Sequence, residues 1–165
     1  MKFINLKTAP IELFNQTINW LKSLTKEIDF EHGEKFALFI QKNSQLEKPL
    51  GLFILYSEID NKVVGVISLV SDDQNVGSEH NLDGIWIAGV QIHRDFRGKG
   101  YGNELFNYID QYISDLGIEN FNVNLFTNNS IAMKLYEKYG FKKIGLEVEK
   151  HNELETVFSK VYNGK

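Results

Sequence analysis

The pattern of hydrophobic and polar residues changes twice near the middle of the chain. From Leu82 to Ile92, apolar residues occupy both alternating faces around Trp86, which is typical of a strand buried on both sides. A polar turn follows, and then apolar residues recur at the spacing of one helical stripe, at Tyr101, Leu105, Tyr108, Ile109, Tyr112, Ile113 and Leu116. The glycine-rich segment Arg97–Gly102 lies between the two patterns. The pattern therefore predicts a buried strand, a glycine turn and an amphipathic helix in direct succession.

Before this centre, the pattern predicts a short strand, two helices and a hairpin. Pro10, just after Thr8, marks a helix start because proline is well tolerated in the first turn. Asp60-Asn61, between two β-rich runs, marks the hairpin turn. The predicted elements are a strand at Phe3–Leu6, a helix to about Thr25 with Ile11, Phe14, Ile18 and Leu21 inward, a helix at about Glu31–Asn43, and strands at Leu50–Glu58 and Lys62–Ser71.

The remaining elements come after the polar stretch Asp72–Asn81, whose composition predicts a loop. The run Phe121–Phe126 alternates apolar residues with asparagines, as a strand does. Asn129 can cap the next helix and Gly140 can end it. That helix has Ala132, Leu135, Tyr136 and Tyr139 on its inner face, and Lys142–Glu149 and Glu155–Tyr162 are predicted to pair around His151-Asn152-Glu153. The order of elements predicts one mixed α/β domain over residues 1–165.

Composition narrows the class of protein. A chain of 165 residues, 42% of them hydrophobic, can bury a real core. The net charge of −4 argues against nucleic acid as a main partner, because there is no excess of cations to neutralise phosphates. Without cysteine, disulfides, thiolate zinc sites and a cysteine nucleophile are excluded. Neither a secretory h-region nor a membrane-length apolar run is found, so we expect a cytoplasmic protein with no membrane partner.

The segment Arg97–Gly102 has the chemistry of an anion site. The first N–H groups of a helix lack partners within the helix, and the helix dipole adds positive charge there. Its glycines let an anion approach the backbone, while Arg97 and Lys99 add formal charge. The spacing G-x-G-x-G fits neither the dinucleotide fingerprint nor a Walker A loop. We therefore expect a pyrophosphate here, with a tight turn that binds nothing as the alternative.

Two motifs, separated by a helix and a strand, carry a resemblance. Arg97-Gly98-Lys99-Gly100-Tyr101-Gly102 is similar to the acetyl-CoA signature Arg/Gln-x-x-Gly-x-Gly/Ala. Its lead-in, Ile92-His93-Arg94-Asp95-Phe96, has Arg94 where proline is common. Residues 129–141 match Asn-x-x-Ala-x-x-Leu-Tyr-x-x-x-Gly-Phe. Both motifs resemble the GCN5-related N-acetyltransferase (GNAT) family. The resemblance covers roughly residues 82–145 and implies a mixed, mostly antiparallel sheet with two splayed parallel strands, flanked by about four helices.

The resemblance implies that acetyl-CoA binds between the splayed strands, here Leu82–Ile92 and Phe121–Phe126. The backbone of Val90 would face the acetyl oxygen and that of Ile92 the pantetheine arm, although their side chains are ordinary core residues. Asn129 would reach the pantetheine side, or serve only as a helix cap. The residues implied for the pyrophosphate are Arg97, Gly98, Lys99, Gly100 and Gly102. No metal is implied.

Tyr136 is the predicted catalytic residue, because the resemblance places the family's thiolate-protonating tyrosine there. A phenol can donate a proton to a leaving thiolate. The alternative for Tyr136 is that its side chain only packs in the core. We interpret Tyr139 as a residue of that structural kind. Histone-type members carry a glutamate base at the position of Trp86, which cannot accept a proton. A water relay is one substitute for that base. The other candidates are Glu58, Glu79, His80 and Asp83, although each is more simply interpreted as a solvated charge. His93 and His151 are interpreted as having no role in catalysis.

These inferences predict an acetyl-CoA-dependent N-acetyltransferase that acts on a primary amine by direct transfer in a ternary complex. The rival hypotheses are a catalytically silent acyl-CoA-binding or regulatory domain, and an enzyme for a longer acyl-CoA. The acceptor is a small-molecule or peptide amine, and the oligomeric state is open, with a homodimer among the options. Acidic residues could favour a cationic amine, and the resembled family roofs its acceptor site with its first two helices. The acidic residues are Asp72, Asp73, Glu79 and Asp83, and the roof candidates are Phe30, Glu31, His32 and Phe36.

Overall fold

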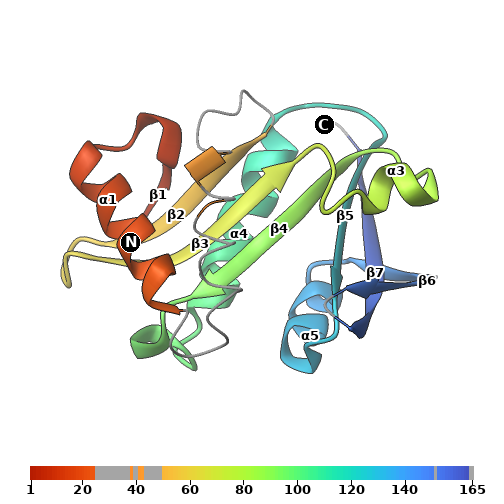
Figure 1. The fold of residues 1–165 in the computed structure, drawn as a ribbon. Helices are drawn as coiled ribbons and strands as arrows, with labels where there is room; N and C mark the ends of the chain where they lie inside the picture. Colours follow the sequence, from red (N-terminus) through yellow and green to blue (C-terminus); the bar gives the residue numbers. More distant parts are fainter. Residues whose placement is uncertain (25–37, 39–40, 43–49, 151, 164–165) are drawn as a thin grey trace. The chain divides into compact units, whose positions relative to one another are not determined.

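The structure, a computed structural model, describes residues 1–24, 38, 41–42, 50–150 and 152–163 (Figure 1). The chain forms two compact units. Unit 1 comprises Met1–Ser68 and Gly89–Tyr101, and unit 2 comprises Leu69–Ala88 and Gly102–Lys165. The predicted helix at Glu31–Asn43 falls largely outside the described residues. The roof candidates and His151 also lie outside them: Phe30, Glu31, His32 and Phe36.

Seven strands form one mixed sheet in the order β1-β2-β3-β4-β5-β7-β6. Strands β4 and β5 are parallel, whereas β1 with β2, β5 with β7, and β6 with β7 are antiparallel. The predicted mixed, mostly antiparallel sheet is therefore confirmed. The strands are β1 Lys2–Asn5, β2 Gly51–Ser57, β3 Lys62–Val70, β4 Ile85–Ile92, β5 Phe121–Thr127, β6 Lys142–Lys150 and β7 Glu153–Tyr162. The described helices are α1 Ile11–Ser23, α3 Val76–His80, α4 Tyr101–Asp115 and α5 Ser130–Lys138, with short 3₁₀ turns η1 Leu6–Thr8 and η3 Arg94–Phe96.

Unit 1 is built around α1, which packs against β2 and β3 (Figure 1). Its buried cluster is Leu6, Ile18, Trp20, Leu21, Leu24, Leu52, Ile54, Val63 and Val66. The inward position predicted for Ile11 is wrong, since that side chain is 63% exposed. The buried residues of α1 all lie in its second half, from Thr17 to Leu21, so the first turn extends beyond the packed face.

Unit 2 holds α4 and α5, which meet through aromatic side chains. The ring of Phe106 on α4 lies 5.2 Å from that of Tyr136 and 5.5 Å from that of Tyr139, measured between centroids. The predicted stripe on α4 is correct at Leu105, Ile109 and Ile113, but Phe106 is buried and Tyr108 is exposed. The buried face of α4 is therefore rotated slightly from the predicted face, towards Phe106 and away from Tyr108.

The loop predicted at Asp72–Asn81 is wrong in its middle, where the short helix α3 forms. The carboxylate of Asp72 accepts hydrogen bonds from the N–H groups of Gly77 (2.7 Å) and Ser78 (2.9 Å). These bonds hold the turn closed from outside the helix. A Cβ at Gly77 would lie 3.0 Å from both Asp72 Oδ1 and Trp86 Nε1, so a larger residue would require these side chains to shift. The polar composition of this segment therefore did not indicate a helix, because the stabilising hydrogen bonds come from Asp72, which lies outside it.

Candidate functional site

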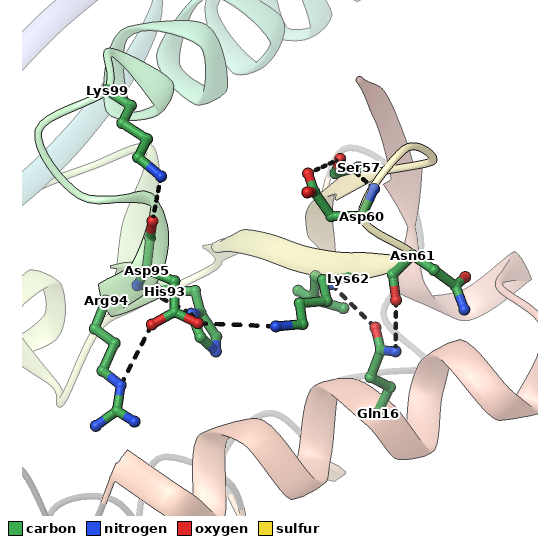
Figure 2. Close-up of polar contacts among 10 residues, drawn as sticks. Gln16, Ser57, Asp60, Asn61, Lys62, His93, Arg94, Asp95 and Lys99 are labelled. Atoms are coloured by element: carbon green, nitrogen blue, oxygen red, sulfur yellow. Dashed lines mark hydrogen bonds and ion pairs between the residues drawn. The ribbon is translucent and has the colours of Figure 1, made fainter.

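The predicted anion segment joins the end of β4 to the start of α4, and its two cations are fastened to nearby backbone. Arg97 Nε donates a hydrogen bond to the carbonyl of Ile92 at 2.9 Å. Lys99 Nζ donates to the carbonyl of Asp95 at 2.7 Å and lies 5.5 Å from the centroid of the Phe96 ring (Figure 2). These hydrogen bonds thus hold both positive charges close to the glycines.

Two of the segment's glycines leave the backbone open. Gly98 has φ +72° and Gly100 has φ +87°, a region that other residues rarely adopt. A Cβ at either position would meet no atom within 4 Å, so the backbone can be approached closely there. Gly102 differs, because a Cβ there would make ordinary contact with Leu135 at 3.7 Å. Open backbone beside two held cations is suited to a phosphate group.

Strand β4 changes character at Gly89. Before it, Ile85–Ala88 is fully buried, as predicted, and the parallel register pairs Ile85 with Val123 and Trp86 with Asn124. Gly89 has φ +61°, a conformation that interrupts a strand ladder as a bulge does. After it, Val90–Ile92 is only half-buried and belongs to unit 1. The predicted ligand-binding positions on β4 therefore follow a break in the strand.

Asn129 caps α5, as predicted. Its side-chain oxygen accepts hydrogen bonds from the N–H groups of Ile131 (3.0 Å) and Ala132 (3.1 Å). Its own N–H donates to the hydroxyl of Thr127 at 3.0 Å. The cap fixes the start of the helix that carries Tyr136. The contact of Asn129 with pantetheine stays a prediction.

Tyr136 is buried, with 6% of its surface exposed. Its ring lies 5.2 Å from Phe106, 6.2 Å from Phe158 and 6.3 Å from Phe141. Burial, and then the charge of Glu155, raises the pKa of the phenol above its ordinary value. The hydroxyl therefore stays protonated at any working pH, so it can act only as a proton donor. Its catalytic role stays a prediction.

Tyr139, one helical turn away, has a different environment. Its hydroxyl donates towards the carbonyl of Asn103 at 2.8 Å and meets Asn107 Oδ1 at 2.7 Å. These bonds tie α5 to α4, which agrees with the structural interpretation of this residue. Tyr139 is therefore a natural comparison for Tyr136.

None of the substitutes proposed for the missing base stands out. Trp86 is completely buried, and its indole N–H has no hydrogen-bond partner among the residues that the structure describes. Glu58 is paired with Lys2, at 2.6 Å between Oε1 and Nζ. The other three candidates are exposed: Glu79, His80 and Asp83.

Two carboxyl groups of unit 2 have pKa values above their ordinary range. Burial, and then the charges of Glu155 and Asp72, together raise the pKa of Asp73 to about 7 against the opposing effect of Lys150. The pKa of Glu155 is also raised, by burial and by Glu153. The charge of Glu155 contributes to the raised pKa of both Asp73 and Tyr136. The sequence offered Asp73 only as one of several loop acids, and nothing in it pairs residue 73 with residue 155.

Replacing Asp73 with Asn should stabilise the protein at pH 8 but not at pH 4. Because the folded-state pKa is raised, ionisation of Asp73 opposes folding, and stability is lost as the pH rises from about 4 to 7. Asn resembles the neutral acid, so the variant escapes this loss. We expect the melting temperature at pH 8 to rise by about 3 °C or more. Thermal melts at both pH values test this, with the exposed Asp83→Asn as the control; equal shifts at both pH values would contradict it.

The fold and these motifs agree with one family. The profile of the acetyltransferase (GNAT) family matches residues 15–141. Because this match covers most of the chain, the chain belongs to the GNAT family.

Comparisons with individual proteins point the same way. YycN, an uncharacterized N-acetyltransferase of Bacillus subtilis (strain 168), is 31% identical over 72 residues, or 44% of this chain and 46% of YycN. The chain thus spans about half the length of that relative. The spermine/spermidine N(1)-acetyltransferase of the same organism is 22% identical over 117 residues, or 70% of this chain and 73% of that protein. The aminoglycoside 6'-N-acetyltransferase complexed with coenzyme A shares the fold, with a TM-score of 0.66 at 13% identity over 98% of this chain and 97% of that one.

Within the part of the chain that the structure describes, no helix is long and apolar enough to cross a membrane.

Proposed function

We propose that this chain transfers an acetyl group from acetyl-CoA directly to a primary amine within a ternary complex, and that residues 1–165 act as one catalytic domain. The observation that carries the proposal is the segment Arg97–Gly102, with open backbone at two glycines and two cations held beside them. The family membership supports an acyl-CoA as the donor.

The donor is held by the groups already described. The pyrophosphate binds Arg97–Gly102, where backbone N–H groups and side-chain charge act together. The backbone of Val90 binds the acetyl oxygen, that of Ile92 binds the pantetheine arm, and Asn129 contacts the same arm. The positive φ of Gly89 supports this, because backbone groups released from a regular ladder are available to a ligand.

The proton transfers involve Tyr136 and the acids near it. The amine nitrogen attacks the thioester carbonyl, the C–S bond breaks, and coenzyme A leaves as a thiolate that takes the proton of the Tyr136 hydroxyl. The proton lost by the amine passes to Asp73, whose pKa of about 7 suits a group that accepts a proton at neutral pH. Glu155 keeps that pKa high through its charge.

A cationic amine, such as a polyamine, is the acceptor that the acids of unit 2 favour. The charge of Glu155 acts on the proposed proton donor and also on Asp73, which gives this unit two coupled carboxyl groups. Similarity to the spermine/spermidine N(1)-acetyltransferase of Bacillus subtilis (strain 168) supports this class of acceptor. The rival, a silent acyl-CoA-binding domain, is favoured by Trp86, which occupies the usual position of the base and cannot take a proton.

Release of free coenzyme A distinguishes these hypotheses. Purified protein is mixed with acetyl-CoA and, separately, spermidine, a lysine-containing peptide and an uncharged amine. We expect thiol release that depends on the amine and is fastest with spermidine. Binding of acetyl-CoA without release for any amine would establish the silent domain instead. Butyryl-CoA in parallel tests the hypothesis of a longer acyl donor.

Acetyl transfer should be unaffected by EDTA. The chain has no cysteine, and the described residues contain no group of three or more His, Asp or Glu side chains arranged to hold a metal. The chemistry proposed above also uses only side chains and backbone. The rate of coenzyme A release is measured before and after dialysis against EDTA. Activity that disappears with EDTA and returns with zinc would contradict this expectation.

A further inference from the structure

His93 joins the end of β4 to the short turn η3, which leads into the proposed donor segment Arg97–Gly102. Its position in the sequence indicates no catalytic chemistry, and the proposed reaction does not use it. The side chain and the backbone of His93 nevertheless both make contacts that bear on the shape of this segment.

The side chain of His93 caps η3 (Figure 2). Its Nδ1 accepts a hydrogen bond from the backbone N–H of Asp95 at 3.3 Å. The turn then closes through backbone bonds from Phe96 to His93 (2.9 Å) and from Arg97 to Arg94 (3.2 Å). The first N–H groups of a helical turn have no partner within it, so an acceptor on the preceding residue stabilises the turn. An imidazole has an acceptor nitrogen only in its neutral form, so His93 caps the turn as a neutral side chain.

The ring of His93 is held by its neighbours in unit 1. It lies 5.4 Å from the ring of Trp20 and 5.7 Å from that of Phe96, measured between centroids. Trp20 is only 9% exposed and belongs to the buried cluster around α1. The backbone N–H of His93 also donates to the carbonyl of Val64 on β3, at 2.8 Å. The core of unit 1 therefore sets the position of Nδ1 from outside the turn that it caps.

The capped backbone also carries the anchors of the two cations of the donor segment. Lys99 Nζ donates to the carbonyl of Asp95 at 2.7 Å, and the N–H of the same residue is the one that His93 holds. Arg97 Nε donates at 2.9 Å to the carbonyl of Ile92, the residue just before His93. A shift of the backbone around His93 would therefore move both positive charges relative to the glycines beside them.

The carboxylate of Asp95 is a weak substitute for this cap. It lies 3.8 Å from Lys62 Nζ and 3.5 Å from Arg94 Nε, and all three side chains are at least half-exposed. Long, exposed ion pairs contribute little to stability. The side chain of His93 is only 20% exposed. The hydrogen bond to Nδ1 is therefore the firmer link between the turn and the core.

We propose that His93 is a positioning residue for the acyl donor. Its Nδ1 caps η3 and thereby holds Arg97 and Lys99 where both can bind the pyrophosphate of acetyl-CoA. His93 touches neither the donor nor the reacting atoms, and its ring serves to place the acceptor nitrogen. The inference rests on the proposed donor site. It predicts that the affinity for acetyl-CoA depends on the acceptor atom at position 93 and not on the ring.

Two substitutions separate the acceptor from the ring. Asparagine keeps an acceptor atom at the same number of bonds from the backbone, whereas phenylalanine keeps a ring without an acceptor. We expect His93→Phe to weaken acetyl-CoA binding by about fivefold or more, and His93→Asn to stay within about twofold of the unsubstituted chain. The melting temperature should follow the opposite order, lower in His93→Asn, because asparagine loses the packing on Trp20. A residue with only a structural role would rank the two variants the same way in both measurements.

Calorimetric titration of the intact chain with acetyl-CoA measures these affinities. His80→Phe, the same change at an exposed histidine of α3, is the control and should leave the affinity unchanged. Unchanged affinity in His93→Phe, or equal losses in both variants of His93, would overturn the inference. Absence of binding to the unsubstituted chain would instead contradict the proposed donor site.

Hydrogen exchange tests the cap in the ligand-free protein, so it does not depend on the donor site. The backbone amides of residues 95–100 should exchange faster in His93→Phe than in the unsubstituted chain, and His93→Asn should resemble the latter. Equal exchange in all three proteins would overturn the inference, whether or not acetyl-CoA binds.

Discussion

Replacing Gly100 with Glu should nearly abolish acetyl-CoA binding while the protein remains folded. A Cβ at Gly100 would have no atom within 4 Å, and the proposed pyrophosphate occupies that open space. The new carboxylate would fill it and repel the phosphates. Calorimetric titration with acetyl-CoA measures the loss, and circular dichroism checks the fold. Unchanged affinity would refute the assignment of this segment.

Two further variants separate charge from backbone strain. Gly117 also has a positive φ, +65°, and a Cβ there would also meet no atom within 4 Å. Gly117→Glu therefore imposes a similar strain and the same charge away from the segment, and it should leave binding intact. Gly100→Ala keeps the strain at the site without the carboxylate, so its effect on binding should be much smaller than that of Gly100→Glu.

Replacing Tyr136 with Phe should lower turnover by roughly 100-fold or more with little effect on donor binding. The substitution removes only the hydroxyl and keeps the ring that packs against Phe106 and Phe158. The phenol is the proposed donor to the leaving thiolate, and its raised pKa keeps it protonated throughout the assay range. Steady-state kinetics and calorimetric titration with acetyl-CoA measure the two effects separately.

Tyr139→Phe is the matched control on the same helix. It breaks the bonds to Asn103 and Asn107, so it should lower the melting temperature while turnover is retained. A polyamine-like amine with a pKa of about 10.4 is neutral in only about one molecule in 2,500 at pH 7, so the rate should rise with pH in both variants. If Tyr136→Phe behaves like Tyr139→Phe, the hydroxyl of Tyr136 is structural and another group protonates the thiolate.

Local periodicity was sufficient to predict most elements of this fold. The buried strand around Trp86 and the helix capped by Asn129 follow from patterns within a few residues. The hairpin at Asp60-Asn61 is also where it was expected, with Asn61 at φ +52°. Such features depend on near neighbours in the chain, which is the information that a single sequence carries best.

Features that depend on distant neighbours were not predicted. Helix α3 is held by the carboxylate of Asp72, whose hydrogen bonds helical spacing does not reveal. The raised pKa of Asp73 depends on Glu155, some eighty positions away in the sequence. The ring of His93 packs beside that of Trp20, which is more than seventy positions away in the sequence. The sequence pattern was enough to predict the donor segment Arg97–Gly102. The electrostatic environment of Asp73 could be found only from the folded chain.

The division of the chain into two units has a consequence for its integrity. The backbone passes between the units three times, after Ser68, after Ala88 and after Tyr101. A single cleavage therefore cannot separate two intact units, because a fragment that keeps the whole of one unit also carries a segment of the other. A fragment that ends at Ser68 lacks His93, whose backbone bonds Val64 and whose ring contacts Trp20. Wherever the chain is cut at one of these crossings, at least one of the two fragments lacks part of its own unit, so a single break damages the fold of at least one unit.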